Sequence, residues 1–163
     1  MAKKQQGSTG TPATVALDRA KVAYTLHTYE HDPAAPSFGM EAAEALERRP
    51  EEVFKTLLVD TGAGLAVGVV PVHKQLDLKA MATALGQKKV AMAQPAEAER
   101  SSGMVVGGIS PIGQRKALPT VLDSSMRELT SVLVSGGRRG LDIELAPDDL
   151  ARLTRATFAT IAR

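Results

Sequence analysis

Val53-Phe54-Lys55-Thr56-Leu57-Leu58-Val59 is the stretch from which the fold of this 163-residue chain can be worked out. It is rich in β-branched and large apolar residues and contains no Gly or Pro, a pattern that predicts a β-strand. Because side chains alternate between the two faces of a strand, Lys55 shares a face with apolar residues. This lysine is either an edge-strand residue that keeps its charge in water or a cation aimed into a pocket.

The segments on either side of this strand predict short elements of both kinds. A Gly-containing turn at residues 60–64 and an apolar stretch at 65–72 complete a β-hairpin. Apolar spacing and capping residues predict helices over 11–21, 40–49, 77–86, 95–102 and from 147 to about 161. Further strands are expected over 22–31, 88–93, 104–106, 119–123, 131–135 and 141–145. With no regular βαβ alternation, this order predicts a mixed α/β fold: a curled, barrel-like sheet of about seven strands surrounded by helices.

Composition indicates one globular domain and excludes several kinds of site. Hydrophobic residues make up 44% and charged residues 23% of the chain, which suits a single domain over 11–163 after a polar, disordered tail over 1–10. Aromatic residues make up only 3%, which argues against a base-stacking surface. The chain has no Cys, so it has no disulfide, thiolate metal site or thiol nucleophile of its own. No apolar stretch is long enough to span a membrane, and a cytoplasmic protein is expected.

The net charge of +2 does not by itself identify a nucleic-acid-binding protein. Basic residues nevertheless occur in pairs: Arg48-Arg49, Lys88-Lys89, Arg115-Lys116 and Arg138-Arg139. Such pairs are usually solvated surface, and phosphate contact is the alternative for any one of them.

His27-Thr28-Tyr29-Glu30-His31 matches the H-x-x-E-H pattern of one class of zinc protease. That pattern binds a metal only on a helix, where residues four apart share a face. The alternation from Val22 to His31 favours a strand instead, so we expect neither a metal nor another cofactor.

Two glycine-rich segments, residues 107–113 and 135–140, predict tight loops in which a ligand can approach main-chain N–H groups. Neither has the spacing of a known phosphate-binding loop, and either alone is more simply a turn. Together with Lys55 and the polar face of the strand that contains Tyr29, they indicate a soluble α/β domain with a loop-lined pocket. No His lies beside a recognisable nucleophile motif.

Several segments, in matching order, resemble the YbaK/EbsC family. They are His27 to Pro33, Val53 to Leu57, Gln75 to Lys79, Val106 to Gly113 and Ser135 to Leu145. The resemblance runs from about Thr11 to Arg163 and is therefore far more specific than any single motif.

The resemblance implies the YbaK-like editing-domain fold and the activity of a bacterial Cys-tRNA(Pro) deacylase, a free-standing relative of the editing domain inserted in prolyl-tRNA synthetases. The implied substrate is the acceptor end of tRNA(Pro) carrying cysteine, and the implied partner is prolyl-tRNA synthetase. The family's mechanism uses the substrate's own thiol, which attacks the ester and leaves as a cyclic thioester. By position, the implied catalytic residues are Lys55, Gly107 and Gly137. The implied substrate-binding residues are Tyr29, Phe38, Thr56, Pro111, Ser135, Gly136 and Asp142.

Alternatives remain for both the role of the lysine and the activity. Lys55 either positions the substrate or, with a pKa lowered by burial, acts as a general base. The chain could instead hydrolyse another mischarged tRNA such as Ala-tRNA(Pro) with water as nucleophile. It could also bind tRNA ends or nucleotides without catalysis.

Overall fold

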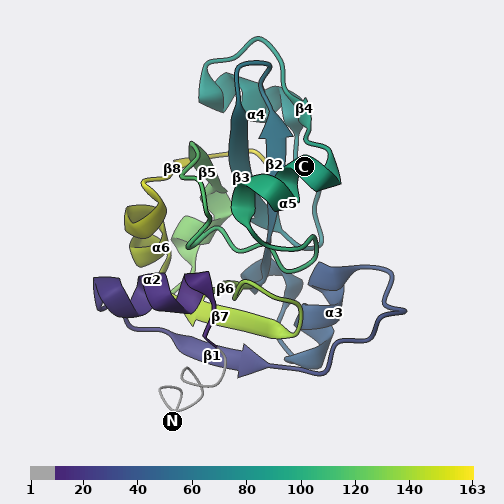
Figure 1. The fold of residues 1–163 in the computed structure, drawn as a ribbon, viewed down its shortest axis with the longest axis vertical. Helices are drawn as coiled ribbons and strands as arrows, with labels where there is room; N and C mark the ends of the chain where they lie inside the picture. The colour runs from purple at the N-terminus through teal and green to yellow at the C-terminus, as the bar shows by residue number, and fades with distance from the viewer. Residues whose placement is uncertain (1–9) are drawn as a thin grey trace.

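The computed structural model describes residues 10–163, which form two β-sheets surrounded by helices (Figure 1). The tail predicted over 1–10 lies outside the described residues except for Gly10. Five α-helices and two 3₁₀-helices occur in the described part: α2 (Pro12–Ala20), α3 (Phe38–Ala45), η1 (Pro50–Glu52), α4 (Leu78–Leu85), α5 (Pro95–Ser102), η2 (Ser124–Glu128) and α6 (Pro147–Thr154). Eight strands occur in the same residues: β1 (Thr25–Thr28), β2 (Phe54–Asp60), β3 (Leu65–Pro71), β4 (Ala91–Met92), β5 (Thr120–Asp123), β6 (Val132–Ser135), β7 (Leu141–Leu145) and β8 (Thr157–Ala159).

The prediction of a mixed α/β fold is confirmed, but the prediction of one barrel-like sheet of about seven strands is wrong. The strands form a three-stranded sheet in the order β1-β7-β6 and a five-stranded sheet in the order β4-β2-β3-β5-β8. The larger sheet is open, because β4 and β8 are its two edges. In Figure 1 the strands of the smaller sheet run across those of the larger one, which stand upright.

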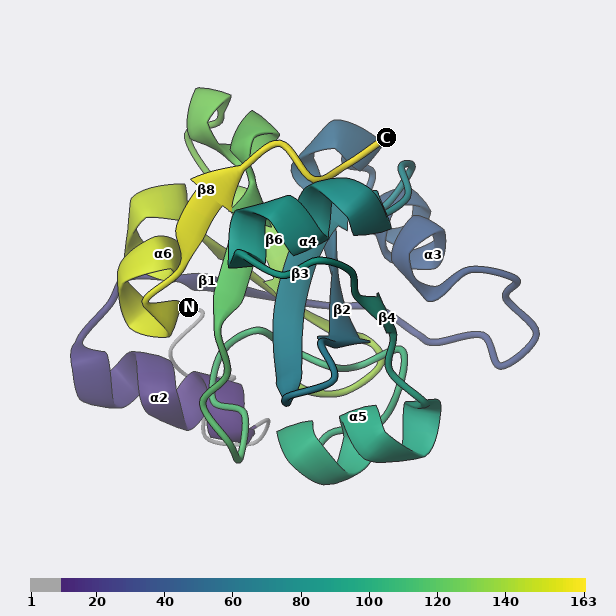
Figure 2. The same ribbon diagram turned by 90° about the horizontal axis from the view of Figure 1, so that it is seen from above.

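One large core joins the two sheets. Apolar side chains of the larger sheet, such as Phe54, Leu58 and Leu122, pack in the same cluster as Val134 and Ile143 of the smaller sheet. Helix α4 covers the other face of the larger sheet, as Figure 2 shows from above, with Met81 and Ala82 in a second cluster. The outer face of the smaller sheet packs against α3 in a third cluster.

The hairpin predicted around residues 53–59 is confirmed. β2 pairs with β3 in antiparallel register from Phe54↔Pro71 to Asp60↔Leu65. The side chains alternate as expected: Phe54 and Leu58 enter the core between the sheets, while Leu57 and Val59 face α4. The period-two pattern thus gives the correct faces of this strand.

The helix predicted over 77–86 is confirmed, together with both of its caps. Asp77 accepts a hydrogen bond from the Ala80 N–H at 3.0 Å, and Gly86 ends the helix with φ of 70°. Both signals lie within one turn of the helix ends, which explains why they can be identified in the sequence.

Two predicted elements are corrected by the structure. Residues 104–106 form a loop rather than a strand, and the main-chain N–H of Val106 donates to the Glu99 carboxylate at 2.9 Å. The last helix ends at Thr154 rather than near Ile161, because Arg155 adopts a left-handed conformation with φ of 55°. Phe158 therefore belongs to strand β8, which pairs in parallel with β5.

Asp123, at the end of β5, holds the segment that follows β8. Its side chain is buried, and its Oδ1 accepts from the main-chain N–H groups of Ile161 and Ala162 at 2.9 Å each. Its Oδ2 accepts from the Ser125 N–H at 3.2 Å. One carboxylate thus satisfies three main-chain donors at the C-terminal edge of the larger sheet.

Over residues 10–163, none of the helices has the length and apolar character that crossing a membrane requires.

We expect Asp123→Ala to lower the free energy of unfolding by about 2–4 kcal/mol, because it leaves buried N–H groups without an acceptor. Chemical denaturation monitored by circular dichroism measures this change. Asp149→Ala is the matched control: Asp149 pairs with Arg152 on the surface, and its loss should cost less than about 1 kcal/mol. Equal effects of the two substitutions would contradict the role assigned to Asp123.

Candidate functional site

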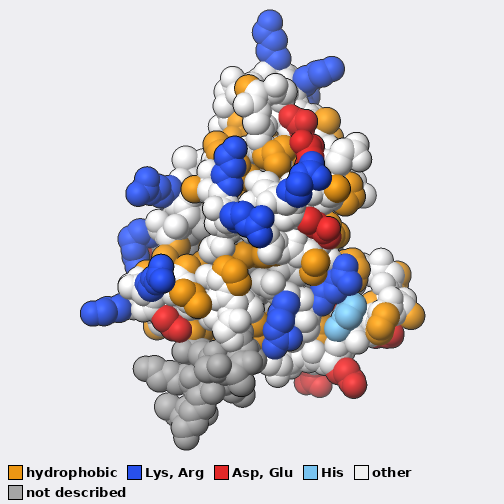
Figure 3. Space-filling view, in the orientation of Figure 1, with side chains coloured by type: hydrophobic (Ala, Val, Ile, Leu, Met, Phe, Trp, Pro, Cys, Tyr) orange, Lys and Arg blue, Asp and Glu red, His pale blue; other side chains and the backbone are white. Residues whose placement is uncertain are grey.

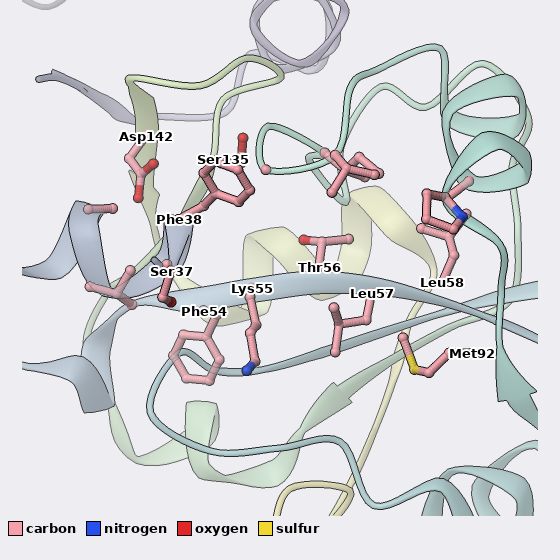
Figure 4. Close-up of a pocket in the computed structure, with 18 of the residues that line it drawn as sticks. Ser37, Phe38, Phe54, Lys55, Thr56, Leu57, Leu58, Met92, Ser135 and Asp142 are labelled. Carbon is pink, nitrogen blue, oxygen red and sulfur yellow. The ribbon is translucent and has the colours of Figure 1, made fainter. Parts of the chain in front are cut away.

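A cavity of about 390 Å³ lies where the two sheets meet. Strand β2 forms one wall with residues 53–58, and Ser135 at the end of β6 and Asp142 on β7 contribute from the smaller sheet. The start of α3, the start of α5 and the loop at Val106 and Gly107 complete the lining (Figure 4). Segments distant in the sequence therefore enclose a single pocket.

The structure brings together seven of the ten predicted site residues. Lys55, Thr56, Tyr29, Phe38, Gly107, Ser135 and Asp142 all line the cavity. Pro111, Gly136 and Gly137 do not, and lie in the loops that support it. The roles of all ten stay predictions.

Lys55 lies on a stretch of β2 that has no described strand paired with it on the side of β4. Val53, the residue before β2, bridges to Leu133 of β6, and further along Leu58 O accepts from Ala93 N at 3.0 Å. Between these points no described strand pairs with the edge of β2 on which β4 lies. Lys55 is half-buried, forms no salt bridge with any residue of 10–163, and its pKa is lowered by burial. Its ammonium is therefore available to a ligand.

Thr56 presents a second polar group without a partner. Its Oγ1 is buried and has no hydrogen bond within the described chain. Figure 4 shows the side chains of Thr56 and Lys55 leaving β2 on opposite sides, with Thr56 directed toward Phe38 and Ser135. A buried hydroxyl without a partner is costly, so this atom can gain a hydrogen bond when a ligand enters.

Asp142 is an acidic residue in an environment that disfavours its charge. The residue is 5% exposed, and its carboxyl makes no hydrogen bond or salt bridge to any part of the chain that the structure describes. Burial raises the pKa of this carboxyl from the ordinary 3.8 to about 7. Burial, and then the nearby charge of Asp142, raise the pKa of the neighbouring Tyr29 to about 12.

Gly107 is a glycine for steric reasons. Its φ is 91°, and a Cβ at this position would lie 2.8 Å from the ring of Phe38 and 2.8 Å from Nε of Arg139. Its N–H has no hydrogen-bond acceptor among residues 10–163, whereas the Gly108 N–H donates to Val105 O at 2.8 Å. The N–H of Ile109, which also lines the pocket, likewise has no acceptor among residues 10–163, so the loop presents two unpaired main-chain donors beside the pocket.

Arg139 closes one side of this loop, a feature that the sequence reasoning did not assign to the site. Its guanidinium lies 4.6 Å from the centre of the Phe38 ring, and its Nε donates to Val106 O at 2.9 Å. The pair Arg138-Arg139 was the only signal for it, and a pair of basic residues does not distinguish a packed arginine from a solvated one.

The glycines of residues 135–140 shape the second loop. Gly136 is packed against Leu141, where a Cβ would lie 2.7 Å from the leucine side chain. The N–H of Gly137 donates to Ser135 Oγ at 3.2 Å. Gly137 thus already uses the donor that a catalytic role would require of it, which favours Gly107 as the main-chain donor.

The two histidines of the H-x-x-E-H pattern bind different carboxylates. His27 Nε2 lies 2.8 Å from Glu144, and His31 Nδ1 lies 2.9 Å from Glu41. Glu144 also accepts from both terminal nitrogens of Arg48, at 3.2 and 3.0 Å, and this arginine holds the pKa of Glu144 at about 2. The network fixes β1 and β7 to the segment after α3.

Apolar residues that the sequence reasoning did not assign to the site form much of the wall. Leu57, Leu58, Met92, Ala98 and Ile109 line it from four separate parts of the chain. No motif distinguishes such residues from ordinary core residues, because their shared position arises only when β2, β4 and α5 come together.

Comparison with known proteins finds a matching family and several similar proteins. Residues 32–153 match the model of a family described as the aminoacyl-tRNA editing domain. The chain is 38% identical over 163 residues to EbsC of Enterococcus faecalis, a protein described as a candidate Cys-tRNA(Pro)/Cys-tRNA(Cys) deacylase; the match covers 99% of this chain and 98% of EbsC.

Two further relatives are more distant. The chain is 25% identical over 100 residues to a proline–tRNA ligase of Kosmotoga olearia, and the match covers 61% of this chain and 17% of the ligase. A crystal structure described as a candidate trans-editing enzyme for prolyl-tRNA synthetase superposes with a TM-score of 0.79 at 24% identity, covering 99% of this chain and 96% of the other. That likeness shows a common fold.

We expect Asp142→Asn to stabilise the protein at about pH 8 and to have little effect at about pH 4. Because folding raises the pKa of this carboxyl, its contribution to stability is complete below the unfolded pKa and is lost as the pH rises toward about 7. The gain at about pH 8 is at most about 4 kcal/mol, since one pKa unit corresponds to about 1.4 kcal/mol.

Urea denaturation of both proteins at the two pH values measures this difference. A variant that is less stable than the wild type at about pH 8 would show that the carboxylate makes a favourable interaction in the free protein.

Proposed function

The chain belongs to the aminoacyl-tRNA editing domain family, and we propose that it deacylates mischarged Cys-tRNA(Pro), with residues 11–163 acting as one deacylase domain. The observation that carries this proposal is the content of the pocket. It contains an unpaired ammonium, an unpaired hydroxyl and a free main-chain N–H, but no Cys or His lines it in the described chain. Such a pocket can hold and polarise an ester without attacking it.

The two serine hydroxyls of the lining are already engaged. Ser37 Oγ accepts from the Met40 N–H at the start of α3, and Ser135 Oγ accepts from Gly137 N. Neither hydroxyl donates a hydrogen bond to a base within residues 10–163, as a serine nucleophile requires; Asp142 lies opposite Ser135 in the sheet but makes no hydrogen bond to it. This arrangement supports a reaction in which the substrate supplies the nucleophile.

The proposed reaction is an intramolecular displacement. The cysteine thiol loses its proton and attacks the carbonyl carbon of its own ester, and the bond to the ribose oxygen breaks. The oxygen takes up a proton and remains on the tRNA, while cysteine leaves as a cyclic thioester. Because attacking and attacked groups belong to one molecule, holding them in the reactive geometry supplies much of the rate enhancement.

We assign separate tasks to the polar groups. The Lys55 ammonium holds the phosphate or sugar oxygens of the terminal adenosine, and the Gly107 N–H donates to the carbonyl oxygen as negative charge develops there. Thr56 Oγ1 contributes a further hydrogen bond. Tyr29, Phe38 and the apolar wall confine the small side chain of the amino acid.

Recognition of tRNA identity is proposed to come from prolyl-tRNA synthetase. The basic side chains visible in Figure 3 are spread over that face rather than gathered into one patch. Arg115, Lys116 and Arg138 are exposed and form no salt bridge within residues 10–163, so they can contact phosphates, whereas the guanidinium of Arg139 already donates to Val106 O. A dispersed charge of this kind favours nonspecific contact with the acceptor end.

The alternative of a deacylase for Ala-tRNA(Pro) is kept because the pocket is apolar enough to accept a methyl side chain. An alanyl ester has no thiol, so its cleavage would require a water molecule as the nucleophile. A binding module without catalysis is the remaining alternative.

Single-turnover deacylation of Cys-tRNA(Pro), Ala-tRNA(Pro) and Pro-tRNA(Pro) tests the proposal. We expect rapid loss of the cysteinyl ester alone, and a reduction of at least about 100-fold in Lys55→Ala because the substrate is no longer held. Lys89→Ala, at an exposed position between α4 and β4, is the matched control and should retain the wild-type rate.

Faster loss of the alanyl ester would indicate the water-dependent activity. If the folded protein cleaves none of the three esters, a deacylase function is excluded.

A further inference from the structure

Within residues 10–163 the carboxyl of Asp142 has no partner, although two side chains next to it in the sheet could have provided one. In the smaller sheet Asp142 lies opposite His27 of β1 and Ser135 of β6. The His27 imidazole bonds to Glu144 instead, at 2.8 Å, and Ser135 Oγ accepts from Gly137 N. Neither bonds to Asp142 anywhere in the hydrogen-bond pattern of residues 10–163.

Glu144, two residues further along β7, is a carboxylate of the same sheet that does have hydrogen-bond partners. It shares a face of the strand with Asp142, but it accepts hydrogen bonds from Arg48 and Ser131 and contacts His27. Asp142 is less exposed and has none of these contacts. Burial without a partner is costly for a carboxyl, so the contrast points to a ligand that supplies the missing group.

Lys55 is not that partner. It forms no salt bridge in the described chain, and in Figure 4 its amino group and the carboxyl of Asp142 do not point toward each other. The pocket therefore holds two unpaired groups of opposite charge, one on β2 and one on β7.

Like the pocket, an aminoacyl ester of tRNA carries a positive charge at one end and a negative charge at the other. The α-amine of the amino acid is cationic when protonated, and the phosphate of the terminal nucleotide is anionic. With Lys55 toward the nucleotide, the amino acid end lies toward β7, where Asp142 is the only acidic side chain that residues 10–163 contribute to the lining.

We propose that Asp142 binds the α-ammonium group of the aminoacyl substrate, so that the pocket accepts esters with a free amine and rejects N-acylated ones such as formyl-, acetyl- or peptidyl-tRNA. This inference rests on the proposed function, since it names the group by which the same pocket recognises the amino acid. An N-acyl group removes the positive charge, adds bulk beside Tyr29 and leaves the buried carboxyl without a partner. Charged tRNA would then be open to editing only before its amino acid enters a peptide.

The experiment measures binding without bond cleavage. The probes are adenosine 5′-phosphate carrying cysteine through a 3′-amide in place of the ester, and the N-acetyl derivative of the same compound. Calorimetry gives the affinity of each probe for the wild type, Asp142→Asn and the control Glu144→Gln. Glu144 lies on the same strand and carries the same charge, but it does not line the pocket.

We expect the wild type to bind the free-amine probe about 10- to 100-fold more tightly than the N-acetyl probe, the range of a charge-assisted hydrogen bond. In Asp142→Asn the preference should fall to less than about threefold, whereas Glu144→Gln should keep it. Circular dichroism of each variant checks that it is folded.

Several outcomes would overturn the inference: equal affinity of the wild type for both probes, no binding of the free-amine probe, or a preference that survives in Asp142→Asn. The two proposals fail separately. An amine preference that depends on Asp142, without deacylation of any charged tRNA, would leave this inference intact and exclude the proposed activity.

N-acetyl-Cys-tRNA(Pro) provides a second readout, because acetylation leaves the thiol free to attack the ester. We expect kcat/KM for this substrate to be at least about tenfold below that for Cys-tRNA(Pro) in the wild type. Similar values would show that the thiol alone selects the substrate.

Discussion

The pocket depends on the junction between the two sheets along β2. This strand belongs to the larger sheet through its pairing with β3, and its preceding residue, Val53, bridges to Leu133 of the smaller sheet. On one side of β2, the smaller sheet contacts the residue before the strand and β4 pairs with the far end of the strand. The segment of β2 between these two contacts has no partner strand on that side among residues 10–163. Lys55 and Thr56 lie on that segment, and Ser135 and Asp142 face it from the other sheet. In a continuous barrel this segment would have been paired with another strand.

The site leaves several polar groups unsatisfied, and the core between the sheets compensates for them. Within residues 10–163 Thr56 Oγ1 and the Asp142 carboxyl lack partners, and Lys55 is half-buried. Each such group lowers the stability of the free protein. Close packing of aliphatic side chains from both sheets, with Leu17 of α2 and Met126 of η2 fully buried, offsets that cost. In the proposed function these groups gain partners from the substrate, so their interaction energy would go into binding rather than into folding.

The two acidic residues on β7 differ in their contacts according to their position along the strand. Glu144 is held by Arg48, His27 and Ser131, and it fixes the smaller sheet to the segment after α3. Asp142 lies at the end of the same face nearest the pocket and has no such partners. The two glycine-rich loops divide in a similar way: the Gly107 N–H is unpaired beside the cavity, whereas Gly137 donates to Ser135.

The sequence by itself determined those features that are encoded within a few residues. They include the alternation and hairpin of β2, the Asp77 and Gly86 caps of α4, and the need for glycine in the tight loops. It also determined, through ordered motifs along most of the chain, the family to which the chain belongs. Only the tertiary structure decided that the strands form two open sheets, that the chain turns at Arg155 to form β8, and that Pro111, Gly136 and Gly137 lie outside the cavity. Only the tertiary structure showed that Asp142 is buried without a partner. The physical reason is that periodicity and capping are local, whereas strand pairing, burial and the neighbours of a charge depend on contacts between segments far apart in the chain.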